Sequence, residues 1–551
     1  MKAVQGVALA SALIHVLTGA PARAGLDPAV KCEALKLSAA GKKAGAALKC
    51  HSKDRIKGGQ LTICMGKAGD KFGAAFAKAE SQVACSEPGD AASVEAQVDA
   101  FVADIASDLP SGVDGAKCAS KKLAAAGKKA QALFKALSKD TKKADAEKFS
   151  DTFGKAQAKL QKAFDKAEAK LACETGDDSV AVRLDIDTFV EDVVDAYGAC
   201  PQQLLYGNEG NRLRRYDLDT VDVGPLVEDI LIERASVDPV NGRDVNGEIC
   251  VVPDGSGDLV MGEDTGQPSP PAGWGVFDST GTQVGKQTPT YFSSQPEPFG
   301  CEFDSSGRLF TSSIGDQPAG FNGQLIMWFP PFDEFPGAPG AYPATDDSST
   351  NFCKIATDIN VSGTVAVDEL DRVYVASSAG FHVRRYSPPF PTAPTPAGGC
   401  GLTDGQGSPV ADTVNEETFV SDPANVPTPS GIVRAPNGNW YISSVLTGVI
   451  AEYDDAGNFV RRVLEPPAGG PGTLPLSVGH PQGLAVDCRT SLYYADLALV
   501  NNGGSIGPGP GGTVRKIRFD LGGTPYDPVV VKGDLAFPDG LGILDGDLET
   551  P

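Results

Sequence analysis

The segment ALKCHSKD, residues 47–54, holds the residue types that come nearest to a redox or metal site. Cys50 followed at once by His51 is the end of the Cys-x-x-Cys-His run that attaches haem, and the same two residue types ligate zinc. Haem attachment also needs a cysteine three residues before Cys50, where Ala47 stands. A structural disulfide through Cys50 is the third interpretation.

An internal repeat separates these interpretations. The segment KCEALKLSAAGKKAGAALKCHSKD from Lys31 returns as KCASKKLAAAGKKAQALFKALSKD from Lys117. Residues 25–112 and 113–200 are therefore two copies of one unit. Alanine, lysine and leucine recur at helical spacing between Gly-Asp and Pro-Gly breaks, which predicts about three helices in each copy.

The cysteines of the two copies predict their own pairing. Two cysteines are kept at the ends of each copy, so we expect the bridges Cys32–Cys85 and Cys118–Cys173. Cys50 falls opposite Ala136, and no cysteine stands opposite Cys64. The second copy has lost both together, as expected if they bond each other, because one alone would be an exposed reactive thiol. We therefore predict a Cys50–Cys64 disulfide, with neither haem nor a metal pair.

The first residues predict export. Residues 1–24 carry an early lysine, an apolar stretch and an Ala-x-Ala exit, which is the order of a secretory signal peptide. Twelve cysteines in an exported chain indicate disulfides, in the periplasm or outside the cell. No second apolar run reaches membrane-spanning length, so no membrane span is expected.

The net charge of −23 is distributed unevenly. Beyond residue 200 about 19 lysines and arginines stand against about 45 acidic residues, whereas residues 25–200 are near neutral. So acidic a surface repels phosphate backbones, which excludes nucleic acid as a partner. Cations such as calcium remain compatible with it.

A second repeat occupies residues 201–551. A glycine, an apolar strand, a turn and an aromatic strand recur in segments such as GCEFDSSGRLFTSS from Gly300 and GIVRAPNGNWYISS from Gly431. A sixth copy of the repeat begins at Gly540, but the sequence ends before its later strands. Residues 204–236 have the pattern of the later strands of such a repeat, with no first strand before them. We therefore expect a mainly β fold, a six-bladed β-propeller closed by pairing of its terminal strands, preceded by an all-α, disulfide-stapled, duplicated helical domain.

The motifs HPQGLAVDCRTSLYYAD, PSGIVRAPNGNWYISS and FPDGLGIL resemble the repeats of NHL-type and regucalcin/gluconolactonase-like six-bladed propellers. This resemblance implies one divalent cation, calcium, in the channel, held by a Glu, Asn residues and an Asp that also serves as base. Glu297 in PEPFG, Asn246 before a blade glycine and Asp539 in PDG match those positions, with Asp539 as the catalytic residue. Ser430 and Gln482 stand where the family has asparagine.

Structural interpretations compete with each of these assignments. Pro-Asp-Gly is a common turn signal for Asp539, and Glu297 between two prolines fits a solvated loop. DGSGD, residues 254–258, resembles the opening of a calcium loop, but Thr265 stands where the loop needs a glutamate, which favours a hairpin turn. Glu263 and Asp264, at the end of an expected strand, are further cation candidates. His382 lies on an expected strand and His480 precedes one, and neither has a serine or cysteine nucleophile partner visible in the sequence.

The remaining cysteines are expected in disulfides whose connectivity the sequence leaves open. Cys250 and Cys301 occupy first strands of neighbouring blades, Cys353 and Cys400 bracket an insertion, and Cys200 and Cys488 remain. The function expected is that of an exported propeller that binds a small-molecule or protein ligand across its channel face. The alternative is a calcium-dependent lactonase or esterase with Glu297, Asn246 and Asp539 around one ion.

Overall fold

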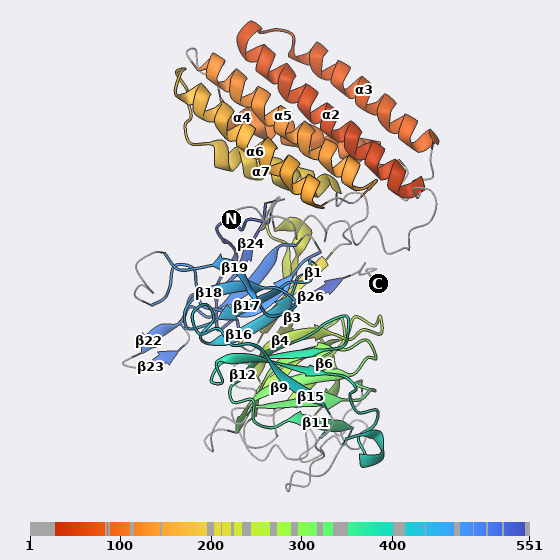
Figure 1. Cartoon of the computed structure of the whole chain (residues 1–551), viewed down its shortest axis with the longest axis vertical. Helices are drawn as coiled ribbons and strands as arrows, with labels where there is room; N and C mark the ends of the chain where they lie inside the picture. Colours follow the sequence, from red (N-terminus) through yellow and green to blue (C-terminus); the bar gives the residue numbers. More distant parts are fainter. Residues whose placement is uncertain are drawn as a thin grey trace. The chain divides into compact units, whose positions relative to one another are not determined.

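The computed structural model (Figure 1) describes residues 28–82, 85, 89–110, 115–143, 146–194, 203–210, 212–221, 225–233, 244–264, 273–287, 296–316, 323–333, 351–400, 411, 414–435, 437–467, 474–488, 490–502, 505–507, 509–520 and 523–545. The chain separates into two compact units. The first is Met1–Pro201 with Phe519–Tyr526, and the second is Gln202–Arg518 with Asp527–Pro551. The expected signal peptide, residues 1–24, lies outside the described residues.

The first unit contains six described α-helices, three from each sequence copy. They are α2 (Pro28–Lys57), α3 (Leu61–Gln82), α4 (Ala91–Asp108), α5 (Ala116–Asp140), α6 (Ala146–Glu168) and α7 (Ser179–Val194). The first helices of the two copies, α2 and α5, pack against each other, with α3 beside α2 and α6 beside α5. A glycine from each allows the close approach, because a Cβ on Gly45 would lie 3.0 Å from the Gly127 carbonyl oxygen. The prediction of a duplicated helical domain is confirmed.

Buried lysines hold the acidic third helix of each copy against the first. Lys122 Nζ lies 2.7 Å from Asp178 Oδ1, and Lys129 Nζ lies 2.6 Å from Asp187 Oδ1. Their counterparts in the first copy, Lys36 and Lys43, make the same kind of ion pair with Asp90 and Asp99. All four lysines are buried, and a buried charge needs such a partner.

Three disulfides of the first unit confirm the pairing predicted from the repeat. Cys32–Cys85, Cys50–Cys64 and Cys118–Cys173 are bonded, with Cα–Cα distances of 5.4, 5.7 and 5.3 Å. Cys50 and Cys64 join α2 to α3 directly. The Cys50-His51 pair is therefore a structural cysteine beside an incidental histidine.

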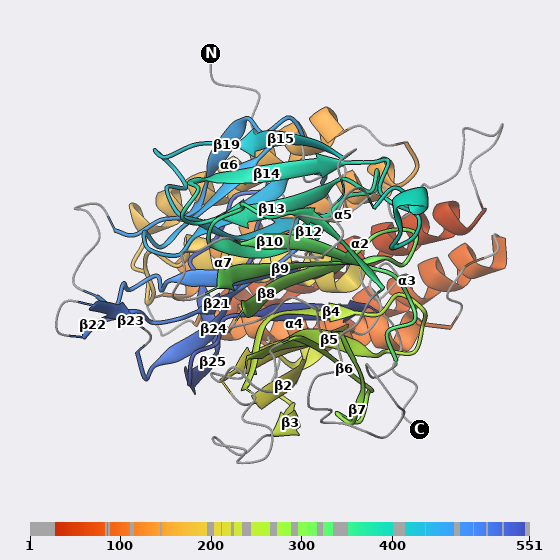
Figure 2. The same cartoon turned by 90° about the horizontal axis from the view of Figure 1, so that it is seen from below.

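The second unit is a six-bladed propeller of four-stranded antiparallel sheets. Blade 1 is β26 (Leu541–Asp545), β1 (Gln203–Glu209), β2 (Arg212–Asp217) and β3 (Glu228–Glu233); blade 2 is β4 (Asp244–Val251), β5 (Leu259–Asp264), β6 (Gly273–Phe277) and β7 (Gln283–Gln287). Blade 3 is β8 (Pro296–Phe303), β9 (Leu309–Asp316), β10 (Gln324–Trp328) and β11 (Phe352–Ala356); blade 4 is β12 (Ser362–Val367), β13 (Val373–Ser377), β14 (His382–Ser387) and β15 (Asn415–Val420). Blade 5 is β16 (Pro429–Arg434), β17 (Trp440–Ser444), β18 (Val449–Tyr453) and β19 (Phe459–Leu464); blade 6 is β20 (Pro481–Val486), β21 (Leu492–Asp496), β24 (Gly512–Ile517) and β25 (Val529–Leu535), with the hairpin β22 (Val500–Asn502) and β23 (Ser505–Gly507) between its strands. Figure 2 shows β12, β13, β14 and β15 side by side in this order.

The two ends of the propeller sequence share blade 1, as predicted. β26 pairs antiparallel with β1, with Leu204 opposite Leu544 and Leu205 opposite Ile543 (Figure 1). β26 also packs against β4 of blade 2 and β20 of blade 6. The innermost strands therefore form a closed ring, which leaves no open sheet edge between the first and last blades.

The glycine that begins each blade repeat lets the innermost strands meet around the axis. A Cβ on Gly483 would lie 2.7 Å from the carbonyl oxygen of Asp539, and one on Gly363 would collide with the carbonyl of Ser430. Gly247, Gly300, Gly431 and Gly540 face backbone of a neighbouring innermost strand in the same way. Only a residue without a side chain fits there, which explains why the sequence repeats glycine at this point.

Candidate functional site

A cavity of about 290 Å³ lies where the six innermost strands come together. Its lining includes Glu248 from β4, Glu302 from β8 and Arg434 from β16, and the other three innermost strands contribute apolar side chains and glycine. Every lining residue follows its blade glycine in the chain. The cavity is therefore an axial site bounded by all six blades.

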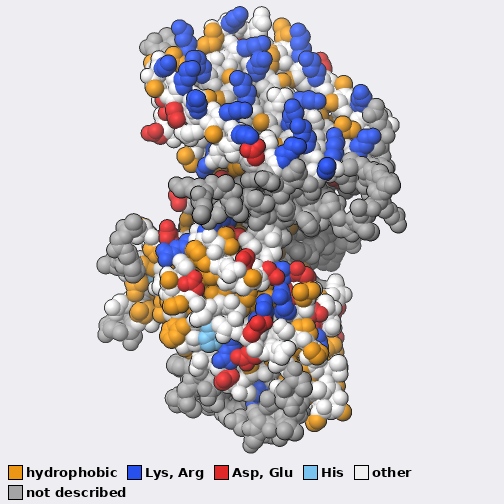
Figure 3. All heavy atoms as spheres, viewed as in Figure 1, with side chains coloured by type: hydrophobic (Ala, Val, Ile, Leu, Met, Phe, Trp, Pro, Cys, Tyr) orange, Lys and Arg blue, Asp and Glu red, His pale blue; other side chains and the backbone are white. Residues whose placement is uncertain are grey.

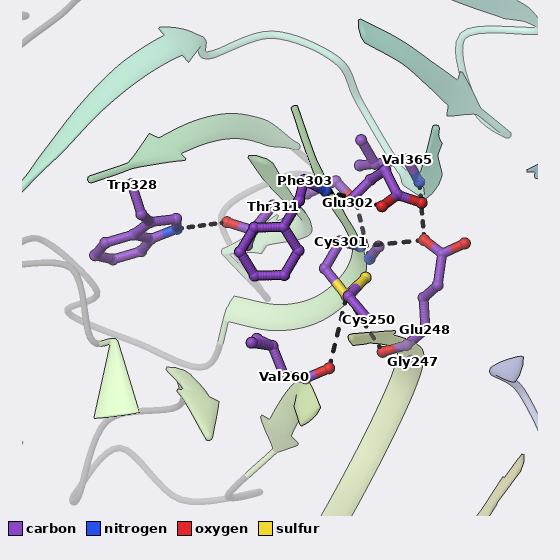
Figure 4. Close-up of a disulfide and its surroundings, with 12 residues drawn as sticks. Gly247, Glu248, Cys250, Val260, Cys301, Glu302, Phe303, Thr311, Trp328 and Val365 are labelled. Carbon is purple, nitrogen blue, oxygen red and sulfur yellow. Dashed lines mark hydrogen bonds between the residues drawn. A yellow bond between two sulfur atoms is a disulfide. The ribbon is translucent and has the colours of Figure 1, made fainter. Parts of the chain in front are cut away.

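The Glu248 carboxylate is held in place by backbone amides of two other blades. Its Oε2 atom accepts hydrogen bonds from the N–H groups of Cys301 and Val365, both at 3.1 Å (Figure 4). The residue is only 8 % exposed. Burial, and then the nearby Glu302 carboxylate, raise the pKa of Glu248 well above its ordinary value, while the two amides oppose the shift.

Glu302 is the second acid of the cavity. Its Oε1 atom accepts a hydrogen bond of 2.9 Å from the N–H of Phe303. Burial raises the pKa of Glu302 from 4.5 to about 7, and this one amide opposes the shift. Both carboxyl groups lose hydration, so each takes up a proton at a higher pH than an exposed glutamate does.

A disulfide fixes the two acids relative to each other. Cys250 on β4 is bonded to Cys301 on β8, with a Cα–Cα distance of 6.0 Å. Figure 4 shows this bridge beside Glu248 and Glu302, which stand on the same two strands. Neighbouring blades 2 and 3 are thus joined covalently next to the cavity, so the carboxyl groups belong to a rigid wall.

The remaining wall is apolar, and its one described cation is already paired. Ile432, Leu484 and Leu541 line the cavity and are buried. The guanidinium of Arg434 donates a 2.9 Å hydrogen bond to Glu369 and lies 3.4 Å from Asp368. Glu369 and Asp368 therefore neutralise the charge of Arg434, and Glu248 and Glu302 are not its ion-pair partners in these contacts.

Asp539, the residue expected to be catalytic, closes the ring between blades 1 and 2. Its Oδ1 atom accepts hydrogen bonds from Asn208 Nδ2 and from the Gly247 N–H at 3.2 Å. Asn208 Oδ1 in turn accepts from the Gly540 N–H at 2.8 Å. Asp539 precedes its blade glycine, so it lies outside the lining of the axial cavity.

The side chains of Asn246 and Glu297, the other two expected cation ligands, lie outside the described residues. Within the described ranges no three acidic, histidine or cysteine side chains converge as a metal site would require. Of the three expected ligands only the Asp539 side chain is described, and its Oδ1 atom already accepts two hydrogen bonds. The calcium set that the family resemblance implies therefore stays a prediction, because the side chains of two of its three ligands lie outside the described residues.

The other polar candidates also have structural contacts. Glu263 is buried and lies 3.4 Å from Lys286 Nζ. The DGSGD segment forms the expected turn, in which the Asp254 carboxylate accepts a 2.8 Å hydrogen bond from the Ser256 N–H. His382 Nε2 accepts from Arg384 at 2.9 Å, and His480 Nδ1 accepts from the Leu499 N–H at 3.1 Å.

Two described disulfides of the propeller join neighbouring blades. Cys250–Cys301 joins blades 2 and 3. Cys353–Cys400, with a Cα–Cα distance of 5.5 Å, joins β11 of blade 3 to the segment between β14 and β15 of blade 4, so the residues that it brackets are three strands of blade 4 rather than an insertion. Cys488 takes part in a disulfide, and Cys200 lies outside the described residues.

Glu248 and Glu302 were not among the residues expected from the sequence, although a signal for them exists. Each stands one or two residues after a blade glycine. The other four blades have uncharged residues at these positions, beginning with Thr364, Ile432, Leu484 and Leu541. Two acids in strands that are otherwise uncharged at this point mark the axial cavity.

Comparison with known proteins finds only distant likenesses. No protein-family model and no curated protein sequence matches the chain. Solved structures that resemble it include a protein of unknown function from Bacteroides caccae (TM-score 0.36, 13 % identity, 62 % of this chain and 99 % of that one) and virginiamycin B lyase from Staphylococcus aureus (0.33, 9 %, 59 % and 76 %). A gluconolactonase from Xanthomonas campestris is similar at TM-score 0.33 and 14 % identity, over 54 % of this chain and 83 % of that one. Likeness at this level gives no basis for an activity.

The raised pKa values predict that the propeller loses stability as pH rises. The folded state binds protons at Glu302 more tightly than the unfolded state does, so the free energy of unfolding falls between pH 4.5 and about 7. For Glu302 the change is about 3 kcal/mol. The three tryptophans, Trp274, Trp328 and Trp440, all lie in the propeller, so urea unfolding followed by tryptophan fluorescence measures it.

The control for this prediction is a comparison of two variants. Glu302→Gln should flatten the fall in stability, whereas Glu465→Gln, at an exposed position, should keep it. A wild-type profile that rises from pH 5 to pH 7, or one that Glu302→Gln leaves unchanged, would contradict the raised pKa.

Proposed function

We propose that this protein is a binding protein whose propeller takes a small organic cation, an amine, into its axial cavity. The observation that carries the proposal is the presence of two carboxyl groups, Glu248 and Glu302, in one cavity enclosed by the six innermost strands. Once they lose their protons, the two groups supply negative charge in a wall that is otherwise apolar except for the paired Arg434.

The raised pKa values favour an ammonium group as the ligand. Burial removes the water that stabilises an ionised carboxylate. An ammonium group replaces that stabilisation, because it brings a positive charge and N–H groups that donate hydrogen bonds. The alkyl part of an amine would contact Ile432, Leu484 and Leu541. The volume of about 290 Å³ lies at the lower end of small-molecule sites, which favours a short aliphatic amine over a larger ligand.

Binding should release protons and strengthen with pH. The amine binds the ionised carboxylates, so its affinity is expected to rise with pH as Glu302, with a pKa of about 7, loses its proton. The raised pKa of Glu248 acts in the same direction. Isothermal titration calorimetry in two buffers of different ionisation enthalpy measures both the affinity and the protons released. We expect proton release near pH 6.5.

Ligand series and variants test the assignment. 1,4-Diaminobutane and butylamine should bind, whereas 1,4-butanediol, which has a similar length and no charge, should not. Glu248→Gln and Glu302→Gln should each weaken diamine binding about tenfold or more, and Glu465→Gln less than about twofold. Equal binding of the diol, or unchanged binding in both cavity variants, would overturn the proposal.

The disulfides support a site of action outside the reducing cytosol. Five bridges are described, and bridges of this number persist in oxidising compartments. We propose that the protein is exported. No helix in the described part of the chain has both the length and the apolar content for a membrane crossing.

A further inference from the structure

A long groove runs between α5 and α6 in the second helical copy. Two adjoining hollows, of about 730 and 490 Å³, share Ala132 and Thr152 in their linings and are therefore one groove. Its floor is made of small and apolar side chains such as Ala125, Ala156 and Leu160. We call this feature the lysine groove, for the reason given next.

Lysines of both helices line this groove. Nine exposed lysines take part, among them Lys121, Lys128 and Lys135 from α5 and Lys155, Lys159 and Lys166 from α6. The lining contains one acid, Asp151, which pairs with Lys155 at 2.5 Å. Figure 3 shows lysine and arginine side chains gathered over the helical unit. The groove thus has an apolar floor and strongly positive sides.

The first copy has a disulfide where the second copy has its groove. Cys50 corresponds to Ala136, and Cys64 falls opposite Thr152 when α3 and α6 are aligned on Lys71 and Lys159. Both Ala136 and Thr152 line the lysine groove. The second copy therefore lacks the bridge between its first two helices at this point of the groove. The duplication has produced one helix pair with a disulfide and one without.

We propose that the lysine groove binds an acidic amphipathic α-helix of a partner protein. An α-helix of 25 residues such as α5 is about 37 Å long, so the groove accommodates a helix of several turns. Small side chains on the floor allow a third helix to approach closely, with its apolar face against Ala125, Ala156 and Leu160. Its acidic flanks then face the lysines on both sides. A free polyanion would satisfy the lysines and leave the apolar floor uncovered.

The same recognition already operates inside this domain. α4 and α7 are apolar helices with acidic residues, and each is held to a lysine-rich helix by an ion pair with a buried lysine. Lys43 binds Asp99 of α4 at 2.8 Å, and Lys129 binds Asp187 of α7 at 2.6 Å. A partner helix in the lysine groove would repeat this chemistry on the open side of α5.

A designed peptide tests the proposal on the full chain. The probe is a peptide of about 21 residues made of the repeat Glu-Ala-Ala-Leu-Glu-Ala-Leu, and the control is the same composition shuffled to remove the apolar face. We expect the repeat peptide to bind, to gain helicity in circular dichroism and to weaken with added salt. The shuffled peptide should bind at least about tenfold more weakly.

The duplication supplies matched variants. Lys128→Ser, Lys135→Ser and Lys159→Ser together should weaken binding about tenfold or more, whereas their counterparts Lys42→Ser, Lys49→Ser and Lys71→Ser together should weaken it less than about twofold. The second triple variant also removes three exposed lysine charges from the same domain, so it controls for the change in net charge.

A second pair of variants tests the groove itself. Ala136→Cys with Thr152→Cys places a bridge where the first copy has one, and in oxidised form it should abolish peptide binding. Ala136→Ser with Thr152→Ser should bind as the wild type does. Equal losses in the two lysine triples, equal binding of both peptides, or full binding by the bridged variant would overturn the proposal. Binding of heparin without binding of the repeat peptide would also overturn it, in favour of a polyanion site.

Discussion

A chain that ends at Gly540, and so lacks β26, is expected to lose the cooperative unfolding of its propeller. β26 supplies the innermost strand of blade 1 and pairs with β1 through five residues, from Leu541 opposite Gly207 to Asp545 opposite Gln203. Its removal exposes the edge of β1 and takes Leu541, which is 1 % exposed, out of the axial wall. The loss should amount to most of the about 5–15 kcal/mol typical of a folded domain.

Tryptophan fluorescence during urea unfolding measures this effect in the propeller alone. A chain that ends at Asp545 keeps β26 and is the matched control, with unfolding expected to remain close to that of the full chain. A Gly540-terminated chain that unfolds in the same cooperative transition as its control would show that blade 1 does not need its C-terminal strand.

The second large effect is expected for Gly363→Ala. A Cβ at this position would collide with the carbonyl group of Ser430, which belongs to the innermost strand of the next blade and is fully buried. The position of a Cβ is fixed by its own backbone, and the carbonyl is itself backbone, so no side-chain rotation can relieve the contact. We expect a loss of about 3 kcal/mol or more in the free energy of unfolding.

The control for Gly363→Ala is Gly511→Ala in the same unit, where a Cβ would meet nothing within 4 Å. This change should alter the free energy of unfolding by less than about 0.5 kcal/mol. Similar effects from both substitutions would mean that the glycines do not set the spacing of the innermost strands.

The sequence predicted most of the fold because its repeats carry the geometry. The two aligned copies predicted the Cys50–Cys64 bridge, and the interrupted sixth repeat at Gly540 predicted the pairing of β1 with β26. In both cases the prediction came from a feature that one copy has and another copy lacks. Such a difference is easier to interpret than the same residues in a sequence without repeats.

The candidate site was harder to predict because its residues act through burial. A family resemblance directed attention to the residues before each blade glycine, including Asp539, whereas the axial cavity is lined by residues that follow the glycines. Glu248 contacts amides on β8 and β12, and no spacing in the sequence brings those strands together around one carboxylate. The lysine groove was equally hidden, since residues 25–200 are near neutral in total and only the packing of α5 against α6 gathers its lysines.

The paired buried carboxyl groups can be observed directly by carboxyl ¹³C NMR of glutamate-labelled protein. Two resonances, lost singly in Glu248→Gln and Glu302→Gln, should titrate far above the usual glutamate range, one of them near pH 7, and both should shift to lower pH when 1,4-diaminobutane is added. If both glutamates instead titrate below about pH 5, or if the diamine leaves both titrations unchanged, the axial cavity is not the cation site proposed here.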